Sequence, residues 1–429
     1  MTNLELNSRL VVFVLGGIMK YIKRSIEEIV QKINKTFKCI LVTGARQTGK
    51  STMLKKLFSD KKYVSFDDPF IEEQARENPN MFMILNQPPV IYDEVQRVTE
   101  LFRYIKIKCD ETDERGLFCL SGSQPFELMK NVSESLSGRV GIIEMSGLSL
   151  REITGDSFNK PFLPTMEYVQ ERGKTPKQQQ NIWQIIHRGS YPELQNPDVD
   201  WTTFYAGYVK TYLERDVRNL SAVQNLDDFR KFMVAVAART GQMLNYSNIA
   251  DEISKDQGTV KNWISILEAS GIIYLLEPYT SSVLKRAIKT PKLYFRDTGL
   301  AAYLTRWLTP ETLAVGAMSG AFFETFVISE ILKSYSNSGI DYRYCVSYYR
   351  GKDKKVNSES EIDVIIEENG VLYPIEIKQG SNVTAAETSA FTVLDKLQDK
   401  KRGMGAIICM CPQPGALREN VLQIPVRYL

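Results

Sequence analysis

The stretch Gly44-Ala45-Arg46-Gln47-Thr48-Gly49-Lys50-Ser51 decides the fold of this chain. A glycine, four further residues and then Gly-Lys-Ser is the spacing of the phosphate-binding P-loop. The apolar, β-prone run 39–43 precedes it, and residues 51–58 follow it with apolar side chains at helical spacing. Because a strand, a glycine-rich loop and a helix are the context that this motif requires, the sequence predicts an α/β nucleotide-binding domain.

The residue types in the loop suit an anionic ligand. Glycines let the backbone turn sharply, so that its N–H groups and the positive end of the following helix face a pyrophosphate. Lys50 is expected to reach the β- and γ-phosphates, and the Ser51 hydroxyl is expected to ligate Mg²⁺. ATP and Mg²⁺ are therefore the predicted cofactors. The predicted nucleotide-binding residues are Gly44, Ala45, Arg46, Gln47, Thr48, Gly49, Lys50, Ser51 and Thr52.

A second acidic motif completes this predicted site. The apolar run 90–92 leads into Asp93 and Glu94, which places both carboxylates at the carboxyl end of a strand. We expect Asp93 to hold Mg²⁺ through water, opposite Ser51. Glu94 is then placed to orient and polarise the attacking water. The alternative for Glu94 is an ordinary surface carboxylate.

Two further residues are catalytic candidates with open alternatives. Ser123, with Gln124 beside it, follows a predicted strand and is expected either to sense the γ-phosphate or to cap a helix without touching ligand. Arg139 follows a glycine turn. It is interpreted as an arginine finger, acting on its own site or on that of a neighbouring subunit in a homo-oligomer, or equally as half of a structural ion pair.

Composition bounds the class of protein. The chain has 429 residues, of which 43% are hydrophobic and 24% charged, as expected for a globular protein of two to four domains. A net charge of +3 restricts any nucleic-acid site to a local patch. Six scattered cysteines and a single histidine argue against zinc and predict reduced thiols in a cytoplasmic protein. The apolar run 10–19 is too short to span a bilayer, so no membrane partner is expected. Residues 1–18 are interpreted as an extension that precedes a natural start at Met19.

The predicted fold is a multidomain α/β chain. A P-loop NTPase unit with a parallel sheet occupies 19–150, a helical lid or linker 151–225, a winged helix-turn-helix 226–300, and a small α/β domain 301–429. In the winged helix, the turn is expected at 256–258, before the recognition helix. The solvent face of this module predicts contact with DNA or another nucleic acid, and packing on a protein partner is the alternative. The expected contact residues are Lys255, Thr259, Lys261, Asn262 and Arg286.

The last domain carries a third constellation of charged residues. With a period of two, Glu376 and Lys378 share one face of a strand, and Asp363 approaches them from the partner strand. This pattern looks like the PD-(D/E)xK nuclease core, and Glu324 matches the acidic residue that the first helix of that core often supplies. The resemblance implies that Asp363 and Glu376 bind Mg²⁺ and that Lys378 assists the attacking water. Ile362 stands where the family name has proline, and the alternative is a structural cross-strand ion pair.

Nearly all of the chain after Met19 resembles a group of bacterial and archaeal AAA-type ATPases. In that group the ATPase is followed by a helical region, a winged helix and a nuclease-like domain of restriction-endonuclease type. The residues that carry the resemblance are 44–52, 90–97, 120–124, 137–140 and the downstream motifs. It implies an ATP phosphohydrolase coupled to a nucleic-acid-directed module. An ATP-gated nuclease and a nucleotide-dependent protein-interaction switch are the alternatives.

Overall fold

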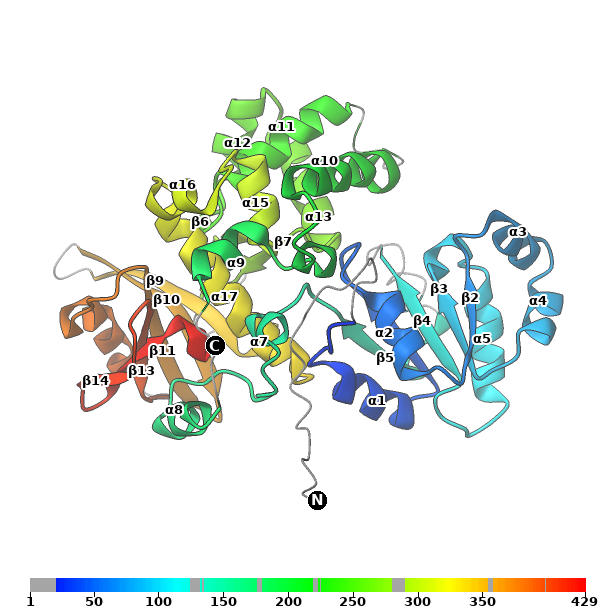
Figure 1. Cartoon of the computed structure of the whole chain (residues 1–429), viewed down its shortest axis with the longest axis horizontal. Coiled ribbons are helices and arrows are strands. Elements are labelled where there is room, and N and C mark those ends of the chain that lie inside the picture. Colours follow the sequence, from blue (N-terminus) through cyan, green and yellow to red (C-terminus); the bar gives the residue numbers. More distant parts are fainter. Residues whose placement is uncertain are drawn as a thin grey trace, which may run out of the picture.

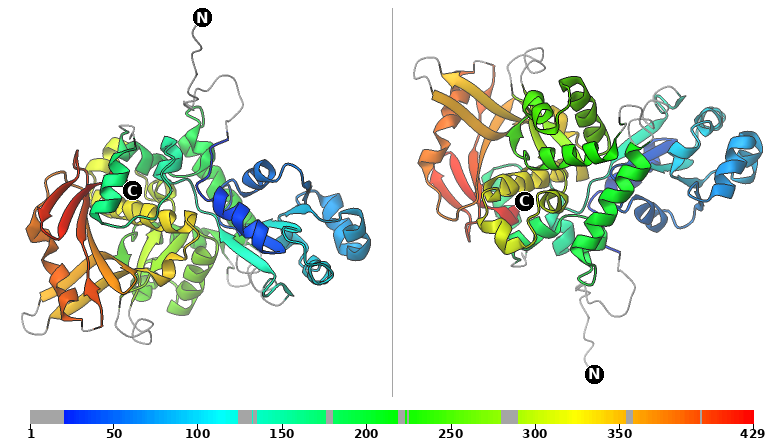
Figure 2. Two further views of the ribbon diagram at one scale, coloured as in Figure 1. Left: turned by 90° about the horizontal axis from the view of Figure 1, so that it is seen from below. Right: turned by 90° about the horizontal axis from the view of Figure 1, so that it is seen from above.

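The computed structural model describes residues 21–123, 132, 135–175, 180–218, 223, 225–279, 290–353, 358–397 and 399–429. The predicted extension 1–18 and the candidates Gln124 and Arg286 lie outside these residues. An N-terminal unit and a C-terminal sheet lie at opposite ends of the molecule, with helices between them (Figure 1). Both further views keep this arrangement (Figure 2).

The N-terminal unit is built on a five-stranded parallel sheet with the order β2-β3-β4-β1-β5. Its inner strand β1 is buried along its whole length, which explains the uninterrupted apolar run before the P-loop. The strands are β1 (Cys39–Thr43), β2 (Lys62–Ser65), β3 (Val90–Asp93), β4 (Phe118–Gly122) and β5 (Val140–Glu144). The helices are α1 (Glu27–Thr36), α2 (Lys50–Leu57), α3 (Pro69–Glu77), α4 (Pro79–Leu85), α5 (Leu101–Asp110) and the 3-10 turn η1 (Val95–Arg97).

The middle of the chain is mainly helical and carries a small antiparallel sheet with the order β6-β8-β7. The sequence predicted a turn at 256–258, but the structure has the start of a helix there. The Asp256 side chain accepts the Thr259 N–H at 2.9 Å and caps this helix, which begins at Gln257. The first elements are α7 (Leu150–Thr154), α8 (Met166–Gly173), α9 (Ile182–Arg188), η2 (Pro192–Gln195), α10 (Trp201–Tyr212) and η3 (Leu213–Val217). The next are α11 (Leu226–Ala237), β6 (Gln242–Met243), α12 (Tyr246–Ile253), α13 (Gln257–Ala269), β7 (Ile273–Leu276), β8 (Lys292–Phe295), α15 (Thr298–Leu304) and α16 (Pro310–Val315).

The C-terminal part packs the long helix α17 (Ser319–Asn337) against a seven-stranded mixed sheet. The sheet order is β14-β15-β13-β11-β10-β9, and β12 pairs with β11. The hairpin β10–β11 is antiparallel with Val364 opposite Ile375, as the two predicted strands required. The remaining elements are η4 (Tyr342–Tyr344), β9 (Val346–Asp353), β10 (Ser358–Glu368), β11 (Val371–Lys378), η5 (Ala385–Lys396), β12 (Lys401–Arg402), β13 (Gly405–Cys409), β14 (Gly415–Arg418), β15 (Val421–Pro425) and η6 (Val426–Tyr428).

One buried apolar cluster runs from Leu150 to Leu429 and crosses the boundaries expected at 225 and 300. The start of the expected lid, α7 and α8, packs beside the C-terminal sheet, because two buried arginines anchor it there. Arg151 Nε donates to the carbonyl oxygen of Leu429 at 3.0 Å, and Arg172 Nε donates to that of Tyr428 at 3.1 Å. None of the helices that the structure describes is long and apolar enough to cross a bilayer.

The buried ion pair of Arg172 offers a test of this anchoring. Arg172 lies 2.6 Å from Asp156, and the two side chains are 2% and 7% exposed. Because Arg172→Ala leaves a buried carboxylate unpaired, we expect the free energy of unfolding to fall by about 3–5 kcal/mol. Lys160→Ala is the matched control, since Lys160 pairs with Glu171 while 58% exposed, and should change stability far less than Arg172→Ala. Urea denaturation measures both, and equal losses would contradict the anchoring role.

Candidate nucleotide-binding site

The P-loop lies between β1 and α2, as the sequence predicted. Gly44, Gln47 and Gly49 have φ of 139°, 61° and 91°, values that glycine adopts far more readily than other residues. A Cβ atom on Gly44 would lie 2.2 Å from the carbonyl oxygen of Met145. The loop therefore passes so close to the end of β5 that only glycine fits at its first position.

The positive charge of Lys50 is held inside the loop. Its side chain is buried, and Nζ donates to the carbonyl oxygens of Gly44 at 3.0 Å and Ala45 at 2.8 Å. Thr48 Oγ1 also donates to the Ala45 carbonyl oxygen, at 3.0 Å. The hydrogen bonds thus keep an ammonium group beside the amino terminus of α2. An anionic ligand at this place is attracted both by the ammonium group and by the partial positive charge of the helix end.

Asp93 collects hydroxyl donors from three neighbouring elements. Its Oδ1 accepts hydrogen bonds from Ser51 Oγ at 2.8 Å and from Ser121 Oγ, and its Oδ2 accepts one from the Tyr63 hydroxyl at 2.5 Å. Burial is the main cause that raises the pKa of Tyr63 above its usual value, and the hydrogen bond to Asp93 is the second. The phenol therefore stays protonated and remains a donor. The structure therefore brings Ser51 and Asp93 together, while the sequence had not singled out Tyr63 or Ser121.

Glu94 and Ser123 also meet at this edge of the sheet. Ser123 Oγ donates to Glu94 Oε2 at 3.1 Å, and Gln96 Nε2 donates to the same carboxylate. Glu94 has φ of 55°, a left-handed conformation that costs a non-glycine residue on the order of 1–3 kcal/mol. Hydrogen bonds from two side chains thus fix the carboxylate that the sequence placed next to the attacking water. The contribution of Gln96 was missed because nothing in its sequence position marks it as a partner of Glu94.

The site's donor set fits a nucleotide bound with magnesium. Ser51 and Asp93 present hydroxyl and carboxylate oxygens, the ligand type that Mg²⁺ prefers. Gly44 lets the loop backbone pass close to Met145, and Lys50 supplies positive charge. Together these residues can hold phosphate oxygens and the metal ion that accompanies them.

Arg139 lies at the amino ends of the strands, whereas this site lies at their carboxyl ends. It precedes β5, whose first residue pairs with Cys39, whereas the P-loop follows Thr43 at the opposite end of β1. The intervening strand spans about 13 Å. Arg139 Nε donates to Asp110 Oδ1 at 2.6 Å, so this arginine forms the structural ion pair that was the alternative to a finger. The placement contradicts a finger acting on its own site, and action on a neighbouring subunit stays a prediction.

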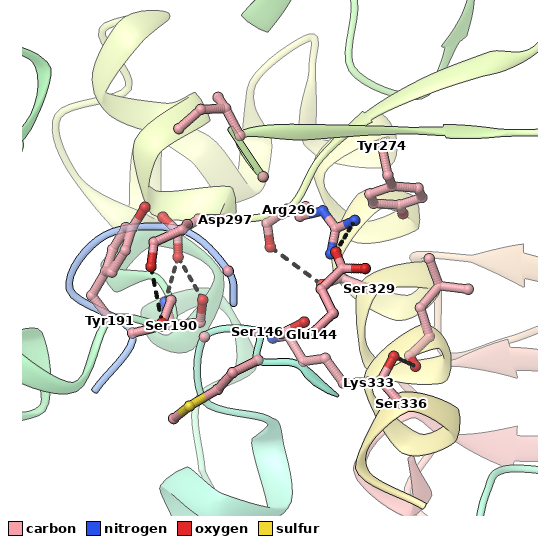
Figure 3. Close-up of a pocket in the computed structure, with 18 of the residues that line it drawn as sticks. Glu144, Ser146, Ser190, Tyr191, Tyr274, Arg296, Asp297, Ser329, Lys333 and Ser336 are labelled. Atoms are coloured by element: carbon pink, nitrogen blue, oxygen red, sulfur yellow. Dashed lines mark hydrogen bonds and ion pairs between the residues drawn. The ribbon is translucent and has the colours of Figure 1, made fainter. Parts of the chain in front are cut away.

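A different pair of arginines borders the P-loop. Glu144, the residue aligned with Thr43, accepts Arg296 Nη2 at 2.7 Å and Arg343 Nη2 at 2.7 Å. Arg296 precedes α15 and Arg343 belongs to η4, so one carboxylate joins three parts of the chain. Figure 3 shows Arg296 directed at Glu144.

A cavity of about 40 Å³ lies beside the loop (Figure 3). Its walls come from the P-loop, from the segment after β5, from the middle helices and from α17. Ser190 faces it and donates to Asp297 Oδ2 at 2.7 Å. The residues of the P-loop that line it are Gly44, Ala45 and Thr48. The nucleotide site is therefore continuous with the junction between the N-terminal unit and the rest of the chain.

Comparison with known families agrees with this geometry. Residues 36–154 match a family model described as an AAA domain. Residues 179–311 and 319–429 match two models described as domains of unknown function, DUF8612 and DUF4143. The first match supports an AAA-type ATPase in this part of the chain, as the sequence predicted. Neither of the others tests the winged helix or the nuclease-like fold.

Similar proteins were found among both curated sequences and solved structures. One uncharacterized protein of Mycobacterium bovis and one of Mycobacterium tuberculosis are each 25% identical over 357 residues, which cover 83% of this chain and 74% of each relative. The Walker-type ATPase of Pyrococcus abyssi is 12% identical, covering 65% of this chain and 94% of its own, with a TM-score of 0.41. A signal transduction ATPase with a tetratricopeptide repeat sensor from Pyrococcus horikoshii is 8% identical, covering 75% and 48%, with a TM-score of 0.26.

The predicted nucleic-acid face is only partly free. Lys255 Nζ lies 2.8 Å from Asp228 Oδ2, and Thr259 Oγ1 donates to Asp256 at 2.5 Å. Lys261 and Asn262 are exposed on α13. The structure therefore leaves Lys261 and Asn262 as the accessible members of the predicted set, and contact with nucleic acid stays a prediction.

The predicted nuclease residues also come together. Lys378 Nζ lies 2.6 Å from Glu376 Oε1, and Asp363 Oδ2 accepts the Ile377 N–H at 2.9 Å. Burial raises the pKa of the Asp363 carboxyl, and the nearby charges of Glu324 and Glu376 raise it further. Glu376 and Lys378 are therefore paired on β11, and Asp363 of the partner strand is hydrogen-bonded to the same strand.

A residue that the sequence did not single out changes the chemistry of this cluster. Lys292 of β8 lies 3.1 Å from Glu324 and 3.8 Å from Asp363, so an ammonium group lies among the carboxylates. Among the residues that the structure describes, no three histidine, cysteine or acidic side chains are arranged to hold a metal ion. A lysine ammonium group therefore lies beside the position predicted for a magnesium ion at Asp363 and Glu376.

The arginine clamp on Glu144 makes stability depend on pH. Chiefly Arg296, and then Arg343, holds the pKa of this carboxyl below its usual value. A lowered pKa adds stability above the unfolded-state pKa, and that stability is lost as pH falls through the folded-state pKa. We expect Glu144→Gln to cost about 1–3 kcal/mol at pH 7 and less between roughly pH 5 and 3. Urea denaturation across this range measures the difference from wild type, and a difference that does not vary with pH would contradict the clamp.

Proposed function

We propose that this chain is a magnesium-dependent ATPase that binds and hydrolyses ATP at the P-loop. The observation that carries the proposal is the meeting of Ser51 and Asp93 at 2.8 Å beside the buried ammonium of Lys50. Bound ATP supplies the phosphoanhydride bond, and its Mg²⁺ neutralises phosphate charge. Lys50 would bind the β- and γ-phosphates, and Ser51 and Asp93 would hold the metal, one directly and one through water.

Hydrolysis, as opposed to binding alone, rests on Glu94. Phosphoryl transfer to water depends mainly on positioning and charge compensation, and a fixed carboxylate provides both for the attacking water. Ser123 and Gln96 hold Glu94 through one carboxylate oxygen, Oε2. Ser123 therefore acts in this proposal as a positioning residue for Glu94.

Two substitutions separate binding from turnover. Lys50→Ala should abolish ATP binding, because the loop loses its only side-chain ammonium. Glu94→Gln should retain binding and lower kcat by about 10²–10⁴, because the amide cannot polarise water as a carboxylate does. Calorimetric titration with ATP and a phosphate-release assay measure the two effects.

Glu100→Gln is the matched control for Glu94→Gln. Glu100 is a nearby carboxylate with a side chain that is 50% exposed, and its substitution should leave both binding and kcat unchanged. A normal rate of hydrolysis by Glu94→Gln would refute the role of Glu94 while leaving ATP binding intact.

We infer further that ATP turnover acts on a nucleic-acid-directed module formed by α11 to β8. The order α11-β6-α12-α13-β7-β8, in which three helices are combined with an antiparallel β6-β8-β7 sheet, supports a winged helix. Exposed Lys261 and Asn262 on α13 support contact with nucleic acid over the alternative of a protein-interaction switch. The ATP-gated nuclease has weaker support, because it requires Mg²⁺ where Lys292 lies.

A charge reversal tests the proposed nucleic-acid contact. Lys261→Glu should weaken binding to double-stranded DNA and reduce the salt slope of log K by about 1, since one phosphate contact is lost. Lys108→Glu is the control, because Lys108 is a lysine on α5 of the N-terminal unit, 41% exposed and outside the predicted face. Fluorescence anisotropy at two salt concentrations measures both variants. Affinity that is indifferent to salt and to Lys261→Glu would favour a protein partner.

A further inference from the structure

Lys292 is a buried lysine in contact with acidic residues from two other elements. Its side chain is 4% exposed, and Nζ lies 2.6 Å from Glu361 Oε1, 3.1 Å from Glu324 Oε1 and 3.8 Å from Asp363 Oδ1. Glu361 and Asp363 lie on β10, Glu324 lies on α17, and the lysine comes from β8 of the middle module. A charge this deeply buried is tolerated only when opposite charges surround it.

We propose that Lys292 is the resident cation of this carboxylate cluster, and that the cluster joins the β6-β8-β7 sheet to the C-terminal domain without binding a divalent metal. The role predicted from the sequence for Asp363 and Glu376 is thereby replaced by an ion-pair network between modules. The inference does not depend on ATP hydrolysis at the P-loop.

In each of Glu324, Asp363 and Glu376, one carboxylate oxygen already has a close partner within the chain. Glu324 Oε1 accepts the Tyr294 hydroxyl at 2.5 Å as well as Lys292, and Asp363 Oδ2 accepts the Ile377 N–H. Lys378 occupies Glu376 Oε1. Mg²⁺ demands near-octahedral oxygen ligands at about 2.0–2.1 Å, so it could bind Glu324 Oε1, Asp363 Oδ2 or Glu376 Oε1 only by displacing these donors. It would also lie close to the full positive charge of Lys292, which opposes its entry.

The backbone fixes the lysine in this position. Tyr348 of β9 donates its N–H to the Glu277 carbonyl oxygen at 3.1 Å and accepts the Tyr279 N–H at 2.5 Å. The Tyr348 hydroxyl donates to the Thr290 carbonyl oxygen, two residues before Lys292. Nζ of Lys292 lies 5.6 Å from the centre of the Tyr348 ring. These contacts attach both arms of the β7–β8 hairpin to the C-terminal sheet, so the lysine is positioned by the same interface that it neutralises.

Metal titration of the full chain tests the proposal directly. Asp93→Asn serves as the reference protein, because it removes the predicted metal ligand of the P-loop site. Electron paramagnetic resonance of added Mn²⁺, without nucleotide, should show the same number of bound ions in Asp93→Asn and in Asp93→Asn/Asp363→Asn. A bound Mn²⁺ in the first protein that disappears in the second would overturn the proposal.

Removal of the lysine gives an independent readout. Lys292→Met should lower Tm, because three partly buried carboxylates lose their cation, and Lys292→Arg should keep Tm close to wild type. Added Mn²⁺ should raise the Tm of Lys292→Met and leave that of Lys292→Met/Asp363→Asn unchanged, because the metal can then take the vacated position. An unchanged Tm in Lys292→Met would overturn the proposal. Where Lys292→Met fails to fold, the paramagnetic resonance titration of Asp93→Asn and Asp93→Asn/Asp363→Asn decides, since both of these proteins keep Lys292.

Discussion

The carboxylate of Glu144 is the interaction on which the joining of the parts depends. It is the last residue of β5 that pairs with β1, opposite Thr43, and its two oxygens accept two guanidinium groups at 2.7 Å each. Arg296 comes from the turn between the small sheet and α15, and Arg343 from the start of the C-terminal sheet. Because each carboxylate oxygen of Glu144 accepts a different guanidinium group, withdrawal of either arginine would leave one oxygen without its donor in a partly buried place.

The segment that follows β5 extends this connection. Lys333 of α17 donates to the Leu148 carbonyl oxygen at 2.9 Å, and Glu330 accepts the Leu150 N–H at 2.7 Å. Arg24 donates both to the Thr48 carbonyl oxygen in the P-loop and to Glu152. The Met145 carbonyl oxygen meanwhile leaves no room for a side chain at Gly44. The P-loop, α7 and α17 are therefore joined by hydrogen bonds and close packing through the segment that follows β5.

The nucleotide site could be predicted from the sequence because its determinants are local. Gly44 to Ser51 define the loop by spacing alone, and Asp93 and Glu94 reach it because the carboxyl ends of parallel strands share one edge. Tyr63, Ser121 and Gln96 could not be assigned, because their contacts depend on strand order and on rotamers. Arg139 was equally suited to a finger or an ion pair until the register of β1 with β5 placed it at the far edge. The expected boundaries at 225 and 300 failed to mark separate cores because apolar periodicity does not reveal which elements share a core.

The C-terminal constellation shows where a motif stops determining chemistry. Alternation along β11 correctly places Glu376 and Lys378 on one face, and the hairpin brings Asp363 to them. The same carboxylates suit a divalent ion or a lysine, because both satisfy an excess of negative charge. Which cation is present depends on Lys292, which lies 71 positions before Asp363 and belongs to another sheet. Its buried contact with Glu324 and Glu361 favours neutralisation by the chain itself, so the acidic motif here acts as one side of an interface.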